Sequence, residues 1–188
     1  MKNLPQNLSE KLKIRKQNNA LRQLPNATSL TDFASNDYLG WSQSELIFDE
    51  THQLLLDRNI KNNGATGSRL LSGNHQLYTE TEGFIARFHQ SESALIFNSG
   101  YDANVGFFSS VPQRGDLILY DELCHASIRD GIQLSKAKAY KFNHNDFEDL
   151  EQLIQRNPNT TLYIVIETVF SMDGDCPNLE ELVSVSNK

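Results

Sequence analysis

Apolar residues recur at near-helical spacing over residues 1–22, where polar side chains separate them. They are Leu4, Leu8, Leu12 and Ile14. The spacing predicts an amphipathic helix whose apolar stripe packs on something outside the helix itself. Asn, Asp and Gly then mark a turn within residues 35–40. Residues 44–58 predict a second helix, capped by Ser42 or Ser44.

The pattern changes after this helix. Residues 64–75, GATGSRLLSGNH, are too rich in glycine and hydroxyl side chains for a helix or a strand. From residue 76 onward, short apolar runs alternate with helical patterns. We expect strands at residues 94–98, 116–121, 137–142 and 162–166, and helices at residues 76–89, from 99, and at 126–134, 147–156 and 178–188. Such alternation implies βαβ units, so we predict an α/β fold with a mainly parallel sheet and helices on both faces.

We expect two parts in the chain. Residues 1–45 would form an N-terminal helix and an arm, and residues 46–188 an incomplete α/β domain. The last expected helix, residues 178–188, looks like the start of a crossover to a strand that does not follow. Either a short protein ends on a helix, or this chain is the front part of a longer one.

Charge and composition narrow the possible partners. With 17 basic and 24 acidic residues among 188, the chain has a net charge of −7. Nucleic acid is not expected as a partner, because the basic stretch at residues 11–16 is interleaved with apolar positions and predicts a solvated helix face. No run approaches the ~20 apolar residues of a membrane span and no secretory signal opens the chain, so we expect a cytoplasmic protein without membrane binding. Cys124 and Cys176 are far apart and indicate neither a disulfide framework nor a metal site.

Ligands of open α/β sheets bind at the carboxyl ends of the strands. The first such place is Ser99, Gly100 and Tyr101, where a helix is expected to begin directly after a strand. Unpaired backbone N–H groups and the helix dipole would bind an anion such as a phosphate there, and Gly100 permits close approach. The same residues also fit an ordinary tight turn, and they lack the spacing of a Walker loop or a dinucleotide fingerprint.

His125 follows the strand expected at residues 116–121 and is the second candidate. An imidazole there can stack on a ligand or exchange protons. A structural histidine near a helix start remains an open alternative. The other histidines occur in polar helical or turn contexts and are expected to be structural: His52, His75, His89 and His144.

A dense, largely polar segment follows the strand expected at residues 162–166. It contains Glu167, Thr168, Ser171, Met172, Asp173, Gly174 and Asp175. Such a cluster is costly unless it meets solvent, a ligand or an interface. The plain alternative is that Glu167 bonds to neighbouring turns and that residues 173–175 form a loop. Residues 64–75 offer hydroxyls, backbone N–H groups and Arg69 for an anion, or they form a solvated loop.

Five motifs occur in the order in which one enzyme family has them. They are FASNDYLG at residues 33–40, GATGSRLLSGNH at 64–75, FNSGYDAN at 97–104, CHAS at 124–127 and ETVFSMDGD at 167–175. On these motifs the chain resembles the α-oxoamine synthases, pyridoxal-phosphate enzymes of the aspartate-aminotransferase fold. It resembles the large domain of fold type I enzymes in truncated form.

The resemblance implies how pyridoxal 5′-phosphate would be held. The cofactor-binding residues would be Ser99, Gly100, Tyr101, His125 and Ser171. The first three would hold the phosphate through backbone groups, His125 would stack on the pyridine ring, and Ser171 would hydrogen-bond the phenolic oxygen. Glu167 would lie beside the cofactor and order the pocket, so that it and His125 are the catalytic candidates.

The resemblance also implies substrates and a partner. Arg22 and Asn36 would lie near the substrate or its carboxylate. Ser68 would belong, with Arg69 and Ser72, to a glycine loop that completes the site across the interface of a homodimer. The family condenses an amino acid with an acyl thioester and releases carbon dioxide, using the cofactor as an electron sink. For the branch resembled most, the substrates would be L-alanine and a pimeloyl thioester of coenzyme A or an acyl carrier protein, in biotin biosynthesis; sister enzymes use glycine or serine.

Three family features have no counterpart here: the aspartate that pairs with the pyridine nitrogen, its nearby histidine and the Schiff-base lysine. All would lie beyond Lys188. Lys136, Lys138 and Lys141 stand outside the family's lysine motif and are expected on the surface. We therefore expect a fragment that does not turn over alone. The alternative, from another class, is a non-catalytic binding or interaction module that kept the phosphate cradle.

Overall fold

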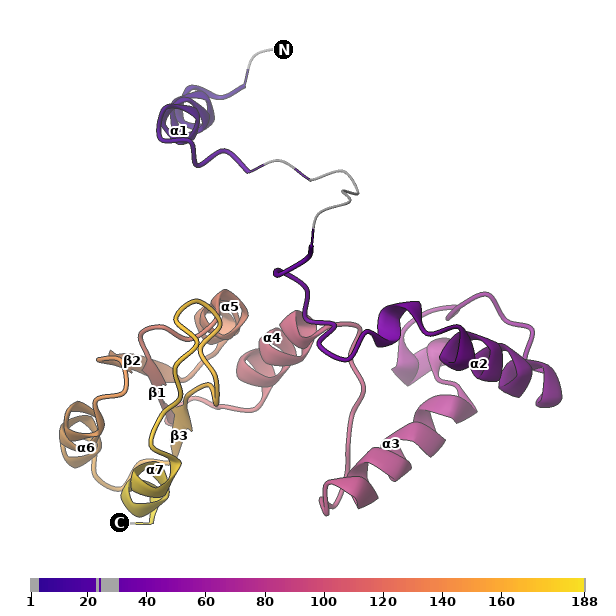
Figure 1. The fold of residues 1–188 in the computed structure, drawn as a ribbon. Helices are drawn as coiled ribbons and strands as arrows, with labels where there is room; N and C mark the ends of the chain where they lie inside the picture. Colours follow the sequence, from indigo (N-terminus) through magenta and orange to yellow (C-terminus); the bar gives the residue numbers. More distant parts are fainter. Residues whose placement is uncertain (1–3, 23, 25–30, 188) are drawn as a thin grey trace. The chain divides into compact units, whose positions relative to one another are not determined.

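The computed structural model describes residues 4–22, 24 and 31–187 (Figure 1). The chain divides into two compact units, Met1–Gly64 and Ala65–Lys188, which we call the first and the second unit. The domain boundary expected near residue 45 stays a prediction. Within the described ranges, no helix combines the length and the apolar character that crossing a membrane demands.

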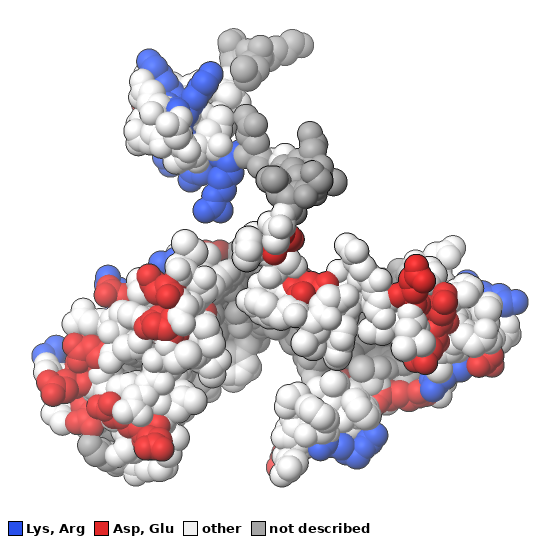
Figure 2. All heavy atoms as spheres, viewed as in Figure 1, with Lys and Arg blue, Asp and Glu red and all other residues white. Residues whose placement is uncertain are grey.

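Among its described residues, the first unit holds two helices and a short turn. They are α1 (Gln6–Gln17), a 3₁₀ turn (Trp41–Gln43) and α2 (Glu45–Asp57). α1 confirms the helix predicted at the start of the chain, although it is shorter than residues 1–22. Pro5 precedes it, and the left-handed backbone of Asn19 follows its end. Its described side chains are all exposed, the apolar ones included, and Lys and Arg side chains project from several sides (Figure 2).

Ser44 caps α2, as the sequence predicted among two alternatives. Its Oγ accepts a hydrogen bond from the backbone N–H of Ile47 at 3.3 Å. The preceding turn is organised by Asp37, whose carboxylate accepts from the N–H of Trp41 at 2.8 Å and from the hydroxyl of Ser42 at 2.5 Å. The hydrogen bond from Ser42 is the main reason why the pKa of Asp37 lies below its ordinary value. The FASNDYLG motif is therefore a turn stabilised by its own aspartate.

The second unit contains the α/β part of the chain. Its elements are α3 (Gln76–Phe88), α4 (Gly100–Ser110), β1 (Leu117–Asp121), α5 (Ala126–Leu134), β2 (Lys138–Phe142), α6 (Phe147–Gln155), β3 (Leu162–Val165) and α7 (Leu179–Ser186). Wherever the sequence predicted both ends of one of these elements, the observed ends lie within two residues of the prediction. Residue 188 of the last predicted helix lies outside the described residues.

The three strands form one parallel sheet in the order β2-β1-β3. One buried cluster lies on the face covered by α4 and α5 and contains Phe108, Ile118, Cys124, Ile128, Ile132 and Val165. A second cluster lies on the face covered by α6 and α7 and contains Leu117, Leu119, Phe142, Phe147, Leu150 and Val185. Neighbours along β1 thus alternate between the two faces, as the strand period of two requires. The predicted α/β fold with helices on both faces is confirmed (Figure 1).

Helices α4 and α5 approach each other closely at Gly131. A Cβ atom added there would lie 2.9 Å from the carbonyl oxygen of Asn104 and 3.0 Å from the Cβ of Phe108. Only a residue without a side chain fits between the two helices at this point. The contact brings the first turns of α4 and α5 into the same region of the second unit.

Two local predictions need correction. No strand forms at residues 94–98, because a strand requires a paired neighbour, and the N–H of Ile96 instead donates to Glu82 Oε1 at 2.8 Å.

Residues 64–75 are not wholly irregular, since Arg69–Gly73 form a short π-helical turn. The backbone of Gly73 packs directly on that of Gly67, where an added Cβ would lie 1.9 Å from the carbonyl oxygen. The glycines of this segment therefore permit a compact loop that the sequence pattern did not reveal.

Candidate functional site

The carboxyl ends of β1 and β3 are joined by side chains that follow them. The two strands are hydrogen-bonded neighbours, with Tyr120 opposite Val165. Beyond them, the carboxylate of Glu167 accepts a hydrogen bond from the backbone N–H of His125. Cys124 adds a second tie through its Sγ, which lies 3.6 Å from the carbonyl oxygen of Val165. The sequence placed both candidate catalytic residues after strands, and the structure brings these two together.

Cys124 itself is fully buried and chemically quiet. Burial, with a smaller contribution from the carboxylates of Glu167 and Asp121, raises the pKa of its thiol to about 12. A thiol with such a pKa stays protonated at neutral pH and is a poor nucleophile. Cys124 therefore packs the site rather than reacting in it.

The ring of His125 is fixed by the start of α5. Its Nδ1 accepts a hydrogen bond from the N–H of Ser127 at 3.1 Å and caps the helix. The hydroxyl of Ser127 lies 2.7 Å from the same nitrogen, and the amide of Asn104 in α4 donates to that hydroxyl at 2.9 Å. These contacts at Nδ1 hold the ring in one orientation. An exposed imidazole held in one orientation is suited to stacking.

The N-terminus of α4 lies beside the start of α5. The hydroxyl of Ser99 caps α4 by accepting from the N–H of Asp102 at 3.0 Å. The hydroxyl of Tyr101 donates to the carboxylate of Asp130 in α5, and this hydrogen bond, with desolvation, raises the pKa of Tyr101. Helix geometry leaves the N–H groups of Gly100 and Tyr101 without intrahelical acceptors. A Cβ added to Gly100 would meet nothing within 4 Å, so a ligand can approach this backbone closely.

These groups fit a phosphorylated aromatic ligand. Free N–H groups at the positive end of a helix dipole favour a phosphate. The oriented imidazole of His125 offers a flat surface for a heteroaromatic ring. Both belong to elements that pack on the same face of the sheet.

Ser171 lies in the loop after β3, in a turn at residues 171–173. Backbone hydrogen bonds between Phe170 and Asp175 (3.0 Å) and between Gly174 and Phe170 (2.8 Å) hold this turn. Gly174 adopts a left-handed backbone there, with φ of +74°. The Ser171 side chain is exposed, and its approach to a ligand stays a prediction.

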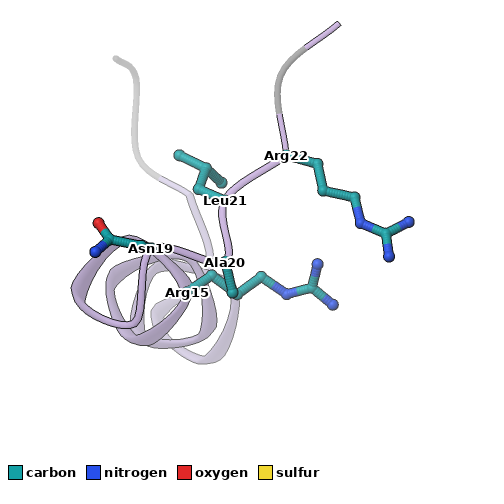
Figure 3. A pocket seen from close by; sticks show the side chains of 5 residues that line it. All are labelled: Arg15, Asn19, Ala20, Leu21 and Arg22. Atoms are coloured by element: carbon teal, nitrogen blue, oxygen red, sulfur yellow. The ribbon is translucent and has the colours of Figure 1, made fainter. Parts of the chain in front are cut away.

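Two predicted substrate residues belong to the first unit. Arg22 lines an open hollow of about 740 Å³ at the end of α1, together with Arg15, Asn19, Ala20 and Leu21. Figure 3 shows the side chains of Arg15 and Arg22 extending to the same side of the chain. Asn36 lies in the turn before α2, where its carbonyl accepts from the N–H of Tyr38 at 2.9 Å. Whether Arg22 and Asn36 face the sheet stays a prediction.

Ser68 and Arg69 stabilise the glycine loop. The carbonyl of Ser68 accepts from the N–H groups of Ser72 and Gly73 at 3.1 and 2.9 Å. The guanidinium of Arg69 forms a two-pronged ion pair with Glu82 of α3, at 2.5 and 2.9 Å, and its Cζ lies 4.3 Å from the ring centroid of Tyr78. Arg69 is thus engaged within its own unit, which favours a structural role over the anion-binding one that the sequence left open.

Sequence reasoning missed a network at the same edge of the sheet. His144, in the turn after β2, lies between the carboxylates of Asp121 and Asp175. The sequence does contain a signal for this network, since His144 follows a predicted strand. Its polar turn context nevertheless led to the prediction of a structural histidine. Asp121 ends β1, directly opposite the last residue of β2, so the same-edge rule would have placed the two side chains together.

Comparison with known proteins identifies the family of the chain. Residues 28–188 match the family described as aminotransferase class I and II. The chain belongs to this family. An 8-amino-7-oxononanoate synthase of Emericella nidulans is 43% identical over 169 residues, which cover 84% of this chain and 41% of the relative. Such relatives place the chain in the α-oxoamine synthase branch of the class I and II aminotransferases.

Solved structures of the branch match the fold. A serine palmitoyltransferase from S. paucimobilis, with bound PLP and myriocin, superposes with a TM-score of 0.82 at 25% identity, covering 97% of this chain and 50% of that one. The 8-amino-7-oxononanoate synthase of Francisella tularensis gives a TM-score of 0.67 at 27% identity, covering 84% of this chain and 42% of that one. The fold is that of the fold type I PLP enzymes. The chain spans 40% to 48% of the length of the curated relatives that it matches.

Proposed function

We propose that this chain provides the phosphate- and ring-binding edge of a pyridoxal-phosphate-dependent acyltransferase. The reaction is the decarboxylative condensation of L-alanine with a pimeloyl thioester, carried on coenzyme A or an acyl carrier protein, to give 8-amino-7-oxononanoate for biotin synthesis. The observation that carries the proposal is the hydrogen bond between Glu167 and the backbone of His125, which joins the two catalytic candidates beside the start of α4.

The residues of this edge have separate roles in the proposal. The backbone N–H groups of Gly100 and Tyr101, with the Ser99 hydroxyl, bind the phosphate. The ring of His125 stacks on the pyridine, and Glu167 holds His125 in position through its backbone. The Ser171 hydroxyl binds the phenolic oxygen. When bound, the cofactor supplies an electron sink that stabilises negative charge on the substrate α-carbon.

The substrate side rests on residues outside this edge. Arg22 and Asn36 bind the substrate or its carboxylate, and Ser68 belongs to a loop that reaches the site of a second copy in a homodimer. Exposed apolar side chains on α2 support an interface of this kind, with Leu46 67% and Phe48 73% exposed.

The 188-residue chain alone is proposed to bind the cofactor without turnover. Lys138 and Lys141 lie on β2 with exposed side chains, and Lys141 pairs with Glu122 at 3.2 Å. Neither follows the strands at the site edge. The covalent lysine of the family is therefore expected from sequence beyond these residues.

Binding is tested with the chain itself and pyridoxamine 5′-phosphate. We expect NMR shifts at the Gly100 and Tyr101 amides and at the His125 ring, and much weaker binding of pyridoxine, which lacks the phosphate. G100D should weaken binding by about tenfold through charge repulsion, whereas the neutral G100N keeps most of it. If pyridoxine binds as tightly as pyridoxamine 5′-phosphate, or if the NMR shifts occur only at other residues, then Gly100 and Tyr101 do not bind the phosphate.

Activity is tested with a chimera in which this chain is followed by the remaining C-terminal part of a curated relative. Pimeloyl-CoA and L-alanine should give 8-amino-7-oxononanoate, free coenzyme A and carbon dioxide. Glycine and L-serine are the comparison substrates, because a serine palmitoyltransferase from Sphingomonas wittichii matches at 36% identity and a TM-score of 0.73. Faster turnover with L-serine than with L-alanine would indicate that the chain belongs to an enzyme that condenses serine. A chimera that folds and binds cofactor but uses no amino acid would favour the non-catalytic module.

A further inference from the structure

His144 joins two parts of the sheet edge that are not neighbours. β2 and β3 flank β1 on opposite sides, so the turn after β2 and the loop after β3 are separated by the end of β1. His144 spans this distance. Its Nδ1 lies 2.9 Å from Asp121 Oδ1, and its Nε2 lies 2.8 Å from Asp175 Oδ2.

Both ring nitrogens of His144 face carboxylate oxygens. A carboxylate accepts and does not donate, so these contacts favour a ring that is protonated on both nitrogens; the amide nitrogen of Asn145 also lies 3.2 Å from Nε2. Asp121 is fully buried and also accepts from the N–H groups of Leu123 at 2.8 Å and Asn145 at 2.9 Å, so it cannot turn away. The pKa of His144 agrees with this geometry: burial lowers it, but the hydrogen bonds to Asp121 and Asp175 outweigh burial and raise it.

Neighbouring groups hold the same loop. The side-chain amide of Asn145 donates to Asp175 Oδ2 at 2.7 Å. The ring of Phe170 meets the ring of His144 edge-on, with 4.5 Å between centroids. Phe170 is buried and Asp175 partly buried, so both ends of the 170–175 turn are fixed next to the imidazole.

We propose that His144 is a positioning residue whose charged ring fixes the loop after β3, and with it Glu167 and Ser171. This role for the cofactor site rests on the proposed function, whereas the control of the loop does not. If the ring loses its charge, one ring nitrogen carries a lone pair that faces a carboxylate and repels it. Asp175 is then released, because the buried Asp121 cannot move away. The loop carrying Ser171 would then loosen while the core strands stay folded.

The pH dependence follows from the charges around the ring. Asp121 faces it from β1 and Asp175 from the loop after β3. On the α6 side, Asp146 and Asp149 accept from the backbone N–H groups of Asp149 and Asn143. Because the folded pKa of His144 is raised, its contribution is fully present below the ordinary histidine pKa and is lost as pH rises through the raised value.

The test measures amide exchange and ring titration in the 188-residue chain. In H144Q, the Gly174 and Phe170 amides should exchange about tenfold faster, while the Leu119 amide keeps its protection. D175N should lower the pH at which His144 titrates and at which the loop loosens, an effect that a purely structural role would not produce. H89Q, which replaces an exposed histidine after α3, should change neither reading. If H144Q fails to fold, the titration of His144 in D175N still tests the proposal.

Unchanged loop exchange in H144Q, or an unchanged His144 titration in D175N, would overturn the proposal. Pyridoxamine 5′-phosphate affinity gives the separate reading for the cofactor site and should fall in H144Q and with rising pH. If wild-type chain binds no pyridoxamine 5′-phosphate but the loop responds as expected, the proposed function fails while the positioning of the loop by His144 stands.

Discussion

The carboxylate of Glu167 accepts a hydrogen bond from the backbone N–H of His125, which lies 42 residues earlier in the chain. This contact fixes the turn after β1 against the turn after β3. It also explains how two residues that the sequence could only place after separate strands come to share one site.

Removing the Glu167 carboxylate should loosen this edge. E167A leaves the His125 N–H without its acceptor and should lower the free energy of unfolding by about 1 kcal/mol, whereas E167Q keeps an acceptor oxygen and should lose less. Urea denaturation of the chain measures both, with the exposed T168A as control. Equal stability of E167A and wild type would show that the contact does not contribute.

The helix contact at Gly131 gives a second prediction. G131A should destabilise the chain by about 1–3 kcal/mol, because the added methyl group meets the α4 backbone and overpacks the interface. G83A is the matched control. Its Cβ would meet only the end of Arg87, at 3.5 Å, so it should stabilise α3 by up to about 1 kcal/mol through helix propensity. Thermal unfolding should therefore shift in opposite directions, and a shared direction would contradict the packing argument.

The α/β part of the fold could be predicted because apolar runs and helical patterns alternate regularly after residue 116. The strand at residues 94–98 was wrong because periodicity reports an apolar segment and not its partner, and here the backbone of Ile96 bonds to Glu82. The local pattern around His144 likewise does not show its contact with the buried Asp121. That contact could be predicted only from the topology, because the pairing of β1 with β2 brings the two side chains to the same edge of the sheet.

Acid should release the glycine loop from α3. The hydrogen bonds from Arg69, with that from the Ile96 N–H, lower the pKa of Glu82 to about 2. Because the folded pKa is depressed, the stabilisation is present above the ordinary glutamate pKa and is lost as pH falls toward 2. Exchange of the Ile96 amide, followed by NMR between pH 5 and pH 2 (about the range between the two pKa values), measures this loss. E82Q should remove most of the dependence, and R69K should weaken it, since lysine cannot form the two-pronged pair.

His125 serves both the helix cap and the proposed ring contact, and two variants separate these roles. H125N keeps a side-chain acceptor for the Ser127 N–H but has no aromatic plane, so stability should be retained while pyridoxamine 5′-phosphate binding falls about tenfold. H125F keeps the plane but loses the cap, so the free energy of unfolding should drop by about 1 kcal/mol with binding largely preserved. Calorimetry of unfolding and of ligand binding gives the two readings. Binding that survives in H125N and fails in H125F would mean that the ring of His125 does not stack on the ligand.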